Sequence, residues 1–322
     1  MTKRVFSLIT GFVGVLVACA TSATEFPVKP IRIVSPFSAG GPTDTLARLI
    51  GQKLTERWGQ PVIVDNKPGA GGNIGAEIVA KSAPDGYTLL IVASSFAVNA
   101  SVYQKLPFDP VRHFSPIINV ASGSFVLMVH PSVPAKSIAE LIAFAKASPG
   151  KLSYASAGIG TANHLAGELF KTLAGVDILH VPYKGSPAAT GDVLSGQVSM
   201  IFNNMISSMP YANTGRVRIL AVTGPKRAAA LPDVPTLAES GLSTFNVTGW
   251  YGILGPAGMP NDVVQRLNSE IARAIQLPEL QASFRAQGVE QVGGNPESFA
   301  AFIRSEIDKW AEVVRAAGIK AE

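Results

Sequence analysis

Cysteine is nearly absent from this chain of 322 residues, in which Cys19 is the only one. Removal of an N-terminal segment that includes Cys19 would leave no thiol, which excludes disulfides, thiolate metal sites and a cysteine nucleophile. The four histidines, His113, His130, His164 and His180, are scattered, without the spacing or carboxylate partners of a zinc site. We therefore expect no metal.

Charge is also sparse, since only 15% of the residues are Asp, Glu, Lys or Arg. The formal net charge is +5, and loss of Lys3 and Arg4 with a leader would lower it to +3. The basic residues form no run. We therefore expect no nucleic-acid partner, because such a partner requires a concentrated basic surface.

Long apolar runs are limited to one, Val5–Ala18, which follows a basic start and precedes small residues. This pattern predicts a secretory signal peptide over residues 1–23 and an exported soluble protein. Leu16–Cys19 also resembles a lipobox, which would leave Cys19 acylated as a membrane anchor. We favour free release, because the polar tether that follows Cys19 is short. A membrane span is disfavoured, because the run is short and no second one follows.

A strand, a tight turn and a helix are predicted near the start of the mature chain. Ile31–Val34 is rich in β-branched residues, Gly40-Gly41-Pro42 break the strand, and Thr43 or Asp44 can cap a helix. Small residues at a helix start leave backbone N–H groups accessible, and the helix dipole favours an anion there. The glycine corner between this strand and helix therefore predicts an anion-binding pocket. The alternative is that Gly40-Gly41 only make the tight turn that any α/β protein needs at such a point. A bulky side chain at Gly40 is expected to abolish binding and leave the fold intact.

A second unit has the same build. Strand Lys151–Ser156 leads into the glycine-containing corner Ala157–Asn163 and then into a helix with a regular apolar face. Both units continue with a strand, a Gly-rich loop, a helix and a third strand, over 61–93 and 178–202 respectively. Two similar βαβαβ halves predict two similar lobes, each with one corner.

Two crossings between the lobes are predicted. The first lies between Pro107 and Pro134 and contains two extended segments, Ile117–Val120 and Phe125–Val129, and the second is Trp250–Pro256. The prediction is a discontinuous first lobe, residues 24–124 and 249–322, and an inserted second lobe, residues 125–248. Two crossings of this kind make a hinged cleft.

The helices outside the repeat carry two predicted start signals. Ser137–Glu140 forms a capping box, and Asn261 and Asp262 are predicted to cap a later helix. The last helix has an aromatic and aliphatic stripe that includes Phe299 and Trp310, which predicts core packing.

Signatures of catalysis are missing. No Gly-x-Ser-x-Gly elbow is present, the loops Gly69–Gly75 and Gly158–Asn163 lack the dinucleotide-binding spacing, and no Lys-Ser/Thr follows a glycine-rich turn. We therefore expect no catalytic residue, no cofactor and no enzyme activity; an α/β-hydrolase-type enzyme is the minor alternative.

Several motifs, spaced along essentially the whole mature chain, resemble those of a known family. They are Ile31–Val34 with Pro36–Gly41, Val64–Gly72, Pro84–Leu90, His180–Gly185 and Leu220–Thr223 with Leu231–Thr236. The chain resembles the Bug family, the TctC-like periplasmic solute-binding proteins of tripartite tricarboxylate transporters. The resemblance implies an α/β type II periplasmic-binding-protein fold, with two Rossmann-like lobes joined by a hinge and a ligand cleft between them.

The resemblance also implies a function. A small carboxylate (a di- or tricarboxylate or an aromatic carboxylate) would be captured by lobe closure and delivered by a monomer to TctA/TctB-like membrane permease subunits. A sensor component that presents its ligand to a membrane histidine kinase is the alternative, because both partners read the closed surface. The implied contacts in the first lobe are Phe37, Ser38, Ala39, Gly40, Gly41, Thr43, Asp44, Asn66, Gly71, Ser94 and Ser95. Those in the second lobe are Ser156, Gly158, Gly160, Thr161, His164, Tyr183, Asn203 and Asn204.

Some of these contacts have structural alternatives. Asp44 could face its own backbone as a helix cap, and His164 could be a hydrogen-bonded structural residue. Many relatives of the family carry Asp at the position of Asn203, where an acidic side chain would suit the ammonium group of an amino acid. The neutral amide of Asn203 therefore favours a purely anionic acid as the ligand. Five aromatic residues could line the pocket or pack in the core: Phe37, Phe96, Tyr183, Phe202 and Trp250.

Overall fold

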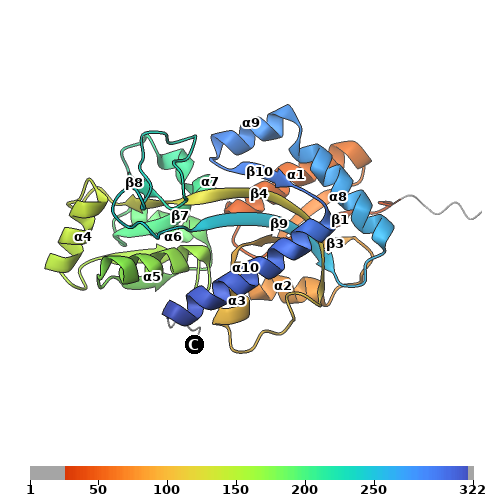
Figure 1. Cartoon of the computed structure of the whole chain (residues 1–322). Helices are drawn as coiled ribbons and strands as arrows, with labels where there is room; N and C mark the ends of the chain where they lie inside the picture. The colour runs from red at the N-terminus through yellow and green to blue at the C-terminus, as the bar shows by residue number, and fades with distance from the viewer. Residues whose placement is uncertain (1–25, 318–322) are drawn as a thin grey trace, which may run out of the picture.

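The computed structural model describes residues 26–317 of the chain (Figure 1). The predicted signal peptide and the alternative anchor Cys19 lie outside the described residues. The described part is a two-lobed α/β protein, with helices on both sides of a curled sheet whose strand order is β2-β1-β3-β9-β4-β7-β5-β6. None of the described helices combines the length and the apolarity needed to cross a membrane.

The first predicted repeat forms three parallel strands with β1 in the middle. Ile33 of β1 pairs with Val64 of β2 and with Leu89 of β3. The elements are β1 (Ile31–Ser35), α1 (Pro42–Trp58), β2 (Val62–Asn66), α2 (Asn73–Ala80), β3 (Thr88–Ala93) and α3 (Ser95–Val102).

The second repeat has the same arrangement, with β5 between β6 and β7 and parallel to both. The prediction of two similar halves is therefore confirmed. The elements are α4 (Ile138–Ala147), β5 (Ser153–Ser156), α5 (Ala162–Ala174), β6 (Leu179–Pro182), α6 (Ser186–Leu194), β7 (Met200–Asn204), α7 (Met205–Ser208) and β8 (Arg218–Val222).

Two long strands connect the halves. Up to Ser124, β4 (Phe114–Val129) pairs with β9 (Thr248–Pro256), and from Phe125 it pairs with β7 and β8. Figure 1 shows β4 and β9 running across the middle of the molecule. We use the change of partners to name a first lobe, residues 26–124 and 248–317, and a second lobe, residues 125–247.

The C-terminal elements return to the first lobe. They are α8 (Asn261–Ile275), α9 (Pro278–Ala286), β10 (Glu290–Gly293) and α10 (Pro296–Ala317). Helix α10 packs on α3 and β4 and also contacts α5 of the second lobe. The predicted stripe on α10 is buried, with Phe299 and Trp310 in the same core as Phe170 of α5. This core therefore continues from one lobe into the other.

One predicted helix start is confirmed and two are wrong. The Ser137 side chain accepts a hydrogen bond from Glu140 N, as the capping box requires. Helix α1 begins at Pro42 with Gly41 as its cap, because proline fits the first helical position; Thr43 and Asp44 are inside the helix. Helix α8 begins at Asn261 itself, after Pro260, and no side chain caps it.

Candidate ligand-binding cleft

A cavity of about 420 Å³ lies between the two lobes. It receives residues from both repeats and from both crossing strands. Its lining consists of Phe37, Pro42, Thr43, Ala93, Ser94, Ser95, Phe125, Ala157, Thr161, Ala162, Asn163, Ser186, Asn204 and Tyr251. None of these residues is charged.

Four helices begin at this cavity. Pro42 and Thr43 open α1, Ser95 opens α3, Ala162 opens α5 and Ser186 opens α6. The first N–H groups of a helix have no partner within that helix, and its dipole places partial positive charge there. Together the four helix starts make a favourable environment for an anion.

Side-chain hydroxyl groups add further hydrogen-bonding capacity. Ser94 and Ser95 are buried, yet their hydroxyls form no hydrogen bond with any described residue. The same is true of the Tyr251 hydroxyl, and burial raises the pKa of Tyr251. Ser186 Oγ accepts from Asn204 Nδ2 at 3.1 Å and keeps its own proton to donate. These groups can donate to a ligand oxygen without an ion pair.

The first corner is tied together by Asp44. Its Oδ2 accepts from Gly40 N at 2.9 Å, and Arg48 donates to both carboxylate oxygens. Burial alone would raise the pKa of Asp44, but the hydrogen bonds from Arg48 and Gly40 lower it overall. The prediction that the corner leaves its backbone N–H groups free for a ligand is therefore wrong at Gly40. It is also wrong at Gly41, whose N–H donates to Ser38 O.

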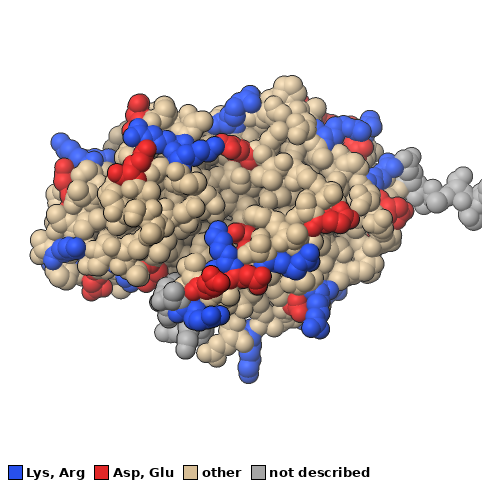
Figure 2. Space-filling model, in the orientation of Figure 1, with Lys and Arg blue, Asp and Glu red and all other residues tan. Residues whose placement is uncertain are grey.

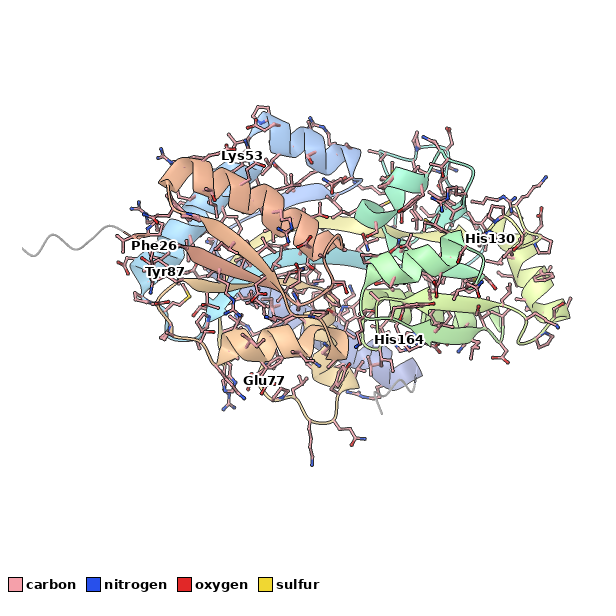
Figure 3. All side chains as sticks on the ribbon, turned by 180° about the vertical axis from the view of Figure 1, so that it is seen from behind. Phe26, Lys53, Glu77, Tyr87, His130 and His164 are labelled. Carbon is pink, nitrogen blue, oxygen red and sulfur yellow. The ribbon has the colours of Figure 1, made fainter. Side chains whose placement is uncertain are left out.

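The second corner is supported by stacked rings. The imidazoles of His164 and His180 stack at 4.3 Å, and His180 stacks on Tyr154 at 4.7 Å. His164 Nδ1 accepts from Gly160 N at 3.4 Å, and His180 Nε2 lies 2.7 Å from Ser156 Oγ. Figure 3 shows His164 on the side of the second lobe that faces the first lobe. The geometry therefore gives His164 the structural role that was its alternative.

Acidification is expected to destabilise the protein through these histidines. Burial lowers the pKa of His164, and burial with the neighbouring His164 lowers the pKa of His180 to about 4. The unfolded chain binds protons near pH 6.5, so the stabilisation is complete above that pH and is lost as pH falls towards 4. In denaturant titrations, His164→Gln/His180→Gln should lose about 1–2 kcal/mol less than the wild type over this range. Equal losses in both proteins would contradict this assignment.

The structure places the predicted contacts in three groups. Phe37, Thr43, Ser94, Ser95, Thr161 and Asn204 line the cavity. Gly71, Gly158 and Tyr183 line a neighbouring opening of about 630 Å³, which shares Phe37 and Ala157 with the cavity. The remaining predicted contacts do not line the cavity: Ser38, Ala39, Gly40, Gly41, Asp44, Asn66, Ser156, Gly160, His164 and Asn203.

Several of these remaining residues hold the corners in place. Asn66 Nδ2 donates to Phe37 O, and Asn203 Nδ2 donates to Thr190 Oγ1. Gly40 lines a separate groove with Pro187, and a Cβ there would meet only Pro187 Cγ at 3.9 Å. The effect of a bulky residue at Gly40 on binding therefore stays a prediction.

Sequence reasoning missed eight lining residues. Ala162 and Asn163 directly follow Thr161, and Ser186 lies in the second lobe's Gly-rich loop, so the repeat itself could have indicated them. Phe125 and Tyr251 lie on the crossing strands, which carried no local signal for a cavity. Pro42, Ala93 and Ala157 also line the cavity, and each is next to a predicted contact in the sequence: Thr43, Ser94 and Gly158 respectively.

Most of the other aromatic candidates pack in the core. Phe96 stacks with Phe108, and Phe202 stacks with Phe245. Trp250 Nε1 donates to Glu306, and the next residue, Tyr251, faces the cavity instead. Of the five candidates, Phe37 lines the cavity and Tyr183 lines the neighbouring opening.

The lobes touch beside the neighbouring opening, which Tyr103, Ile159 and Lys184 line. Ser38 Oγ of the first lobe donates to Lys184 O of the second at 3.2 Å, and the Tyr103 hydroxyl donates to Ile159 O at 3.4 Å. A Cβ on Gly160 would lie 2.4 Å from Asn99 Oδ1, so the backbone of one lobe approaches the other closely. In the described arrangement the two lobes are therefore in direct contact.

A two-lobed α/β fold with an uncharged, N–H-rich cavity between its lobes defines a receptor of the periplasmic-binding-protein class. The family model described as "Tripartite tricarboxylate transporter family receptor", TctC, matches residues 46–319. The chain is 37% identical over 320 residues to protein BugT of Bordetella pertussis, and the match covers 98% of each chain. This chain therefore belongs to the TctC/Bug family of periplasmic receptors.

Solved structures are similar over nearly the whole chain. R. palustris Rpa4515 with adipate has a TM-score of 0.90 at 37% identity, and the match covers 92% of this chain and 99% of that one. MatC from Rhodopseudomonas palustris with bound malate has a TM-score of 0.86 at 31% identity, and the match covers 90% and 100%. Both proteins hold dicarboxylates, so carboxylate binding occurs among the relatives of this chain.

Proposed function

We propose that this protein captures a small carboxylate in the cavity between its lobes and delivers it to a membrane permease of the tripartite tricarboxylate type. The observation that carries the proposal is the convergence of four helix starts on a cavity without charged side chains. N–H and hydroxyl donors would hold the carboxylate, and each hydrogen bond to a charged group contributes about 1.5–3 kcal/mol. The adipate and malate held by the two similar structures support this class of ligand.

The distribution of polar and apolar groups in the cavity also indicates which shape of ligand would fit. Its polar groups include Ser94 and Ser95 from the first lobe and Ser186 from the second, whereas Phe37 and Phe125 are apolar. A short dicarboxylate with an apolar middle would match this distribution. Contacts with both lobes would favour the closed arrangement, because only that arrangement satisfies both ends.

A thermal-shift screen of small carboxylates tests the binding part of the proposal. At 100 times its dissociation constant, a ligand stabilises the folded state by about 2.7 kcal/mol, which raises the Tm by about 4–8 °C for a chain of this size. Adipate and malate are the first acids to test, with adipamide as the uncharged control. A carboxylate should raise the Tm and adipamide should not; no shift with any carboxylate would contradict the proposal.

A second experiment tests delivery. In cells that lack the gene, uptake of the radiolabelled acid should be lost and should return with the wild-type gene. Unchanged uptake with loss of acid-dependent gene expression would contradict delivery and would assign the protein to a sensor kinase.

A further inference from the structure

One side chain at the contact between the lobes buries a polar atom that has no partner. Asn99, on α3, is 1% exposed. Its Nδ2 donates to Gly71 O at 3.1 Å and to Asn73 Oδ1 at 2.8 Å. Its Oδ1 is fully buried and accepts no hydrogen bond from any described residue. A buried acceptor of this kind destabilises the arrangement that buries it, because it has lost its hydrogen bonds to water.

The second lobe covers this oxygen. A Cβ on Gly160 would lie 2.4 Å from Asn99 Oδ1, so the backbone of Gly160 is packed directly against it. The N–H group of Gly160 cannot satisfy the oxygen, because it donates to His164 Nδ1. Both partners of Asn99 Nδ2, in contrast, belong to the first lobe. Separation of the lobes would therefore return Oδ1 to water and leave the hydrogen bonds of Nδ2 intact.

Tyr103, one turn further along α3, makes the opposite kind of contact with the second lobe. Its hydroxyl donates to Ile159 O at 3.4 Å, so a hydrogen bond forms there when the lobes meet. Asn99 and Tyr103 thus contact successive residues of the second corner, Gly160 and Ile159 respectively. The contact of Asn99 opposes closure, and the contact of Tyr103 favours it.

Charged side chains contribute little to the balance between open and closed lobes. Lys226 of the second lobe and Glu290 of the first form an ion pair at 4.0 Å, with side chains that are 80% and 71% exposed. Exposed pairs of this kind are weak in water. Figure 2 shows Lys and Arg interspersed with Asp and Glu over one face of the molecule, with no continuous surface of one sign. Buried contacts such as that of Asn99 therefore have the larger effect on closure.

We propose that Asn99 limits the affinity for the ligand, because its buried oxygen disfavours the closed arrangement and so promotes release. The proposal rests on the proposed capture of a carboxylate between the lobes. Asn99 does not line the cleft cavity, so it acts on the ligand through the equilibrium between open and closed lobes. When the binding-competent arrangement is less populated, the apparent affinity falls in proportion.

Asn99→Ala tests this proposal. The variant should bind adipate, or the tightest acid from the screen, about five- to tenfold more tightly than the wild type does. The gain should come from slower dissociation, because the change favours the closed arrangement. Loss of the Nδ2 hydrogen bonds affects both arrangements equally and should lower only the stability. Isothermal titration, stopped-flow dissociation and denaturant unfolding measure these three effects.

Two variants serve as controls. Asn73→Ala removes one partner of Asn99 Nδ2 but leaves Oδ1 against Gly160, so it should lose stability and keep the wild-type affinity. Tyr103→Phe removes the hydrogen bond to Ile159 O and should weaken binding.

Three outcomes would decide against the proposal. Unchanged or weaker binding in Asn99→Ala, or an equal gain in Asn73→Ala, would overturn it, whereas acid binding by the wild type would still support the proposed function. If the wild type binds no carboxylate, both proposals fail.

Discussion

Gly160→Ala is expected to weaken carboxylate binding at least tenfold while both lobes stay folded. Its Cβ would lie 2.4 Å from Asn99 Oδ1 and 3.2 Å from Tyr103 Cε2, and both atoms belong to the opposite lobe. The added methyl group would therefore obstruct closure of the two lobes over the ligand. The left-handed backbone of Gly160, with φ +77°, adds about 1–2 kcal/mol of strain. Isothermal titration with adipate, or with the tightest acid from the screen, measures the loss.

A matched control separates the steric effect from the strain. Gly175 follows α5 with φ +61°, and a Cβ there would meet no atom within 4 Å. Gly175→Ala should therefore lose similar stability and keep its affinity. Asn99→Ala should recover part of the affinity in the Gly160→Ala background, because it removes the obstructing oxygen. Wild-type affinity in Gly160→Ala, or an equal loss in Gly175→Ala, would contradict obstruction of closure.

Asn204→Asp should weaken carboxylate binding by about 100-fold or more. The change places a negative charge in the wall of the cavity, and two like charges about 4–5 Å apart repel by about 3–4 kcal/mol at an effective dielectric constant of 20. The fold should persist, because Asn204 Oδ1 accepts from Ser207 N at 2.9 Å and an Asp oxygen can do the same. Isothermal titration and denaturant unfolding measure the two effects.

The control for added charge is Asn261→Asp. Asn261 is exposed at the start of α8 and does not line the cavity, so the same change in net charge should leave binding unaltered. If Asn204→Asp binds the acid as the wild type does, then the carboxylate does not lie near Asn204.

The repeat could be predicted from the sequence because its signals are local. β-branched runs such as Ile31–Val34 and glycine breaks such as Gly40-Gly41 specify the strands and corners, and the same order recurs after Lys151. Parallel strands then place their carboxyl ends at one edge of each sheet, where ligands bind in α/β proteins. Ser94, Ser95 and Thr161 follow from this rule, and all three line the cavity.

The rest of the fold and of the candidate site depends on long-range contacts, which no local sequence pattern encodes. Strand β9 is buried on both faces from Gly249 onward. Its sequence therefore has no alternation of apolar and polar residues that could show that Tyr251, rather than Trp250, faces the cleft. The approach of Asn99 to Gly160 joins different lobes and requires the closed arrangement. The extended segments Ile117–Val120 and Phe125–Val129 were predicted separately, whereas pairing with β9 keeps one strand continuous from Phe114 to Val129.

A crystal structure of the protein with its tightest carboxylate tests the central claim most directly. We expect the acid between the lobes, with its oxygens within hydrogen-bonding distance of hydroxyls such as Ser95 Oγ and of first-turn N–H groups such as that of Ala162. No lysine or arginine should contact it. An acid bound elsewhere, or held by a basic side chain, would contradict the account.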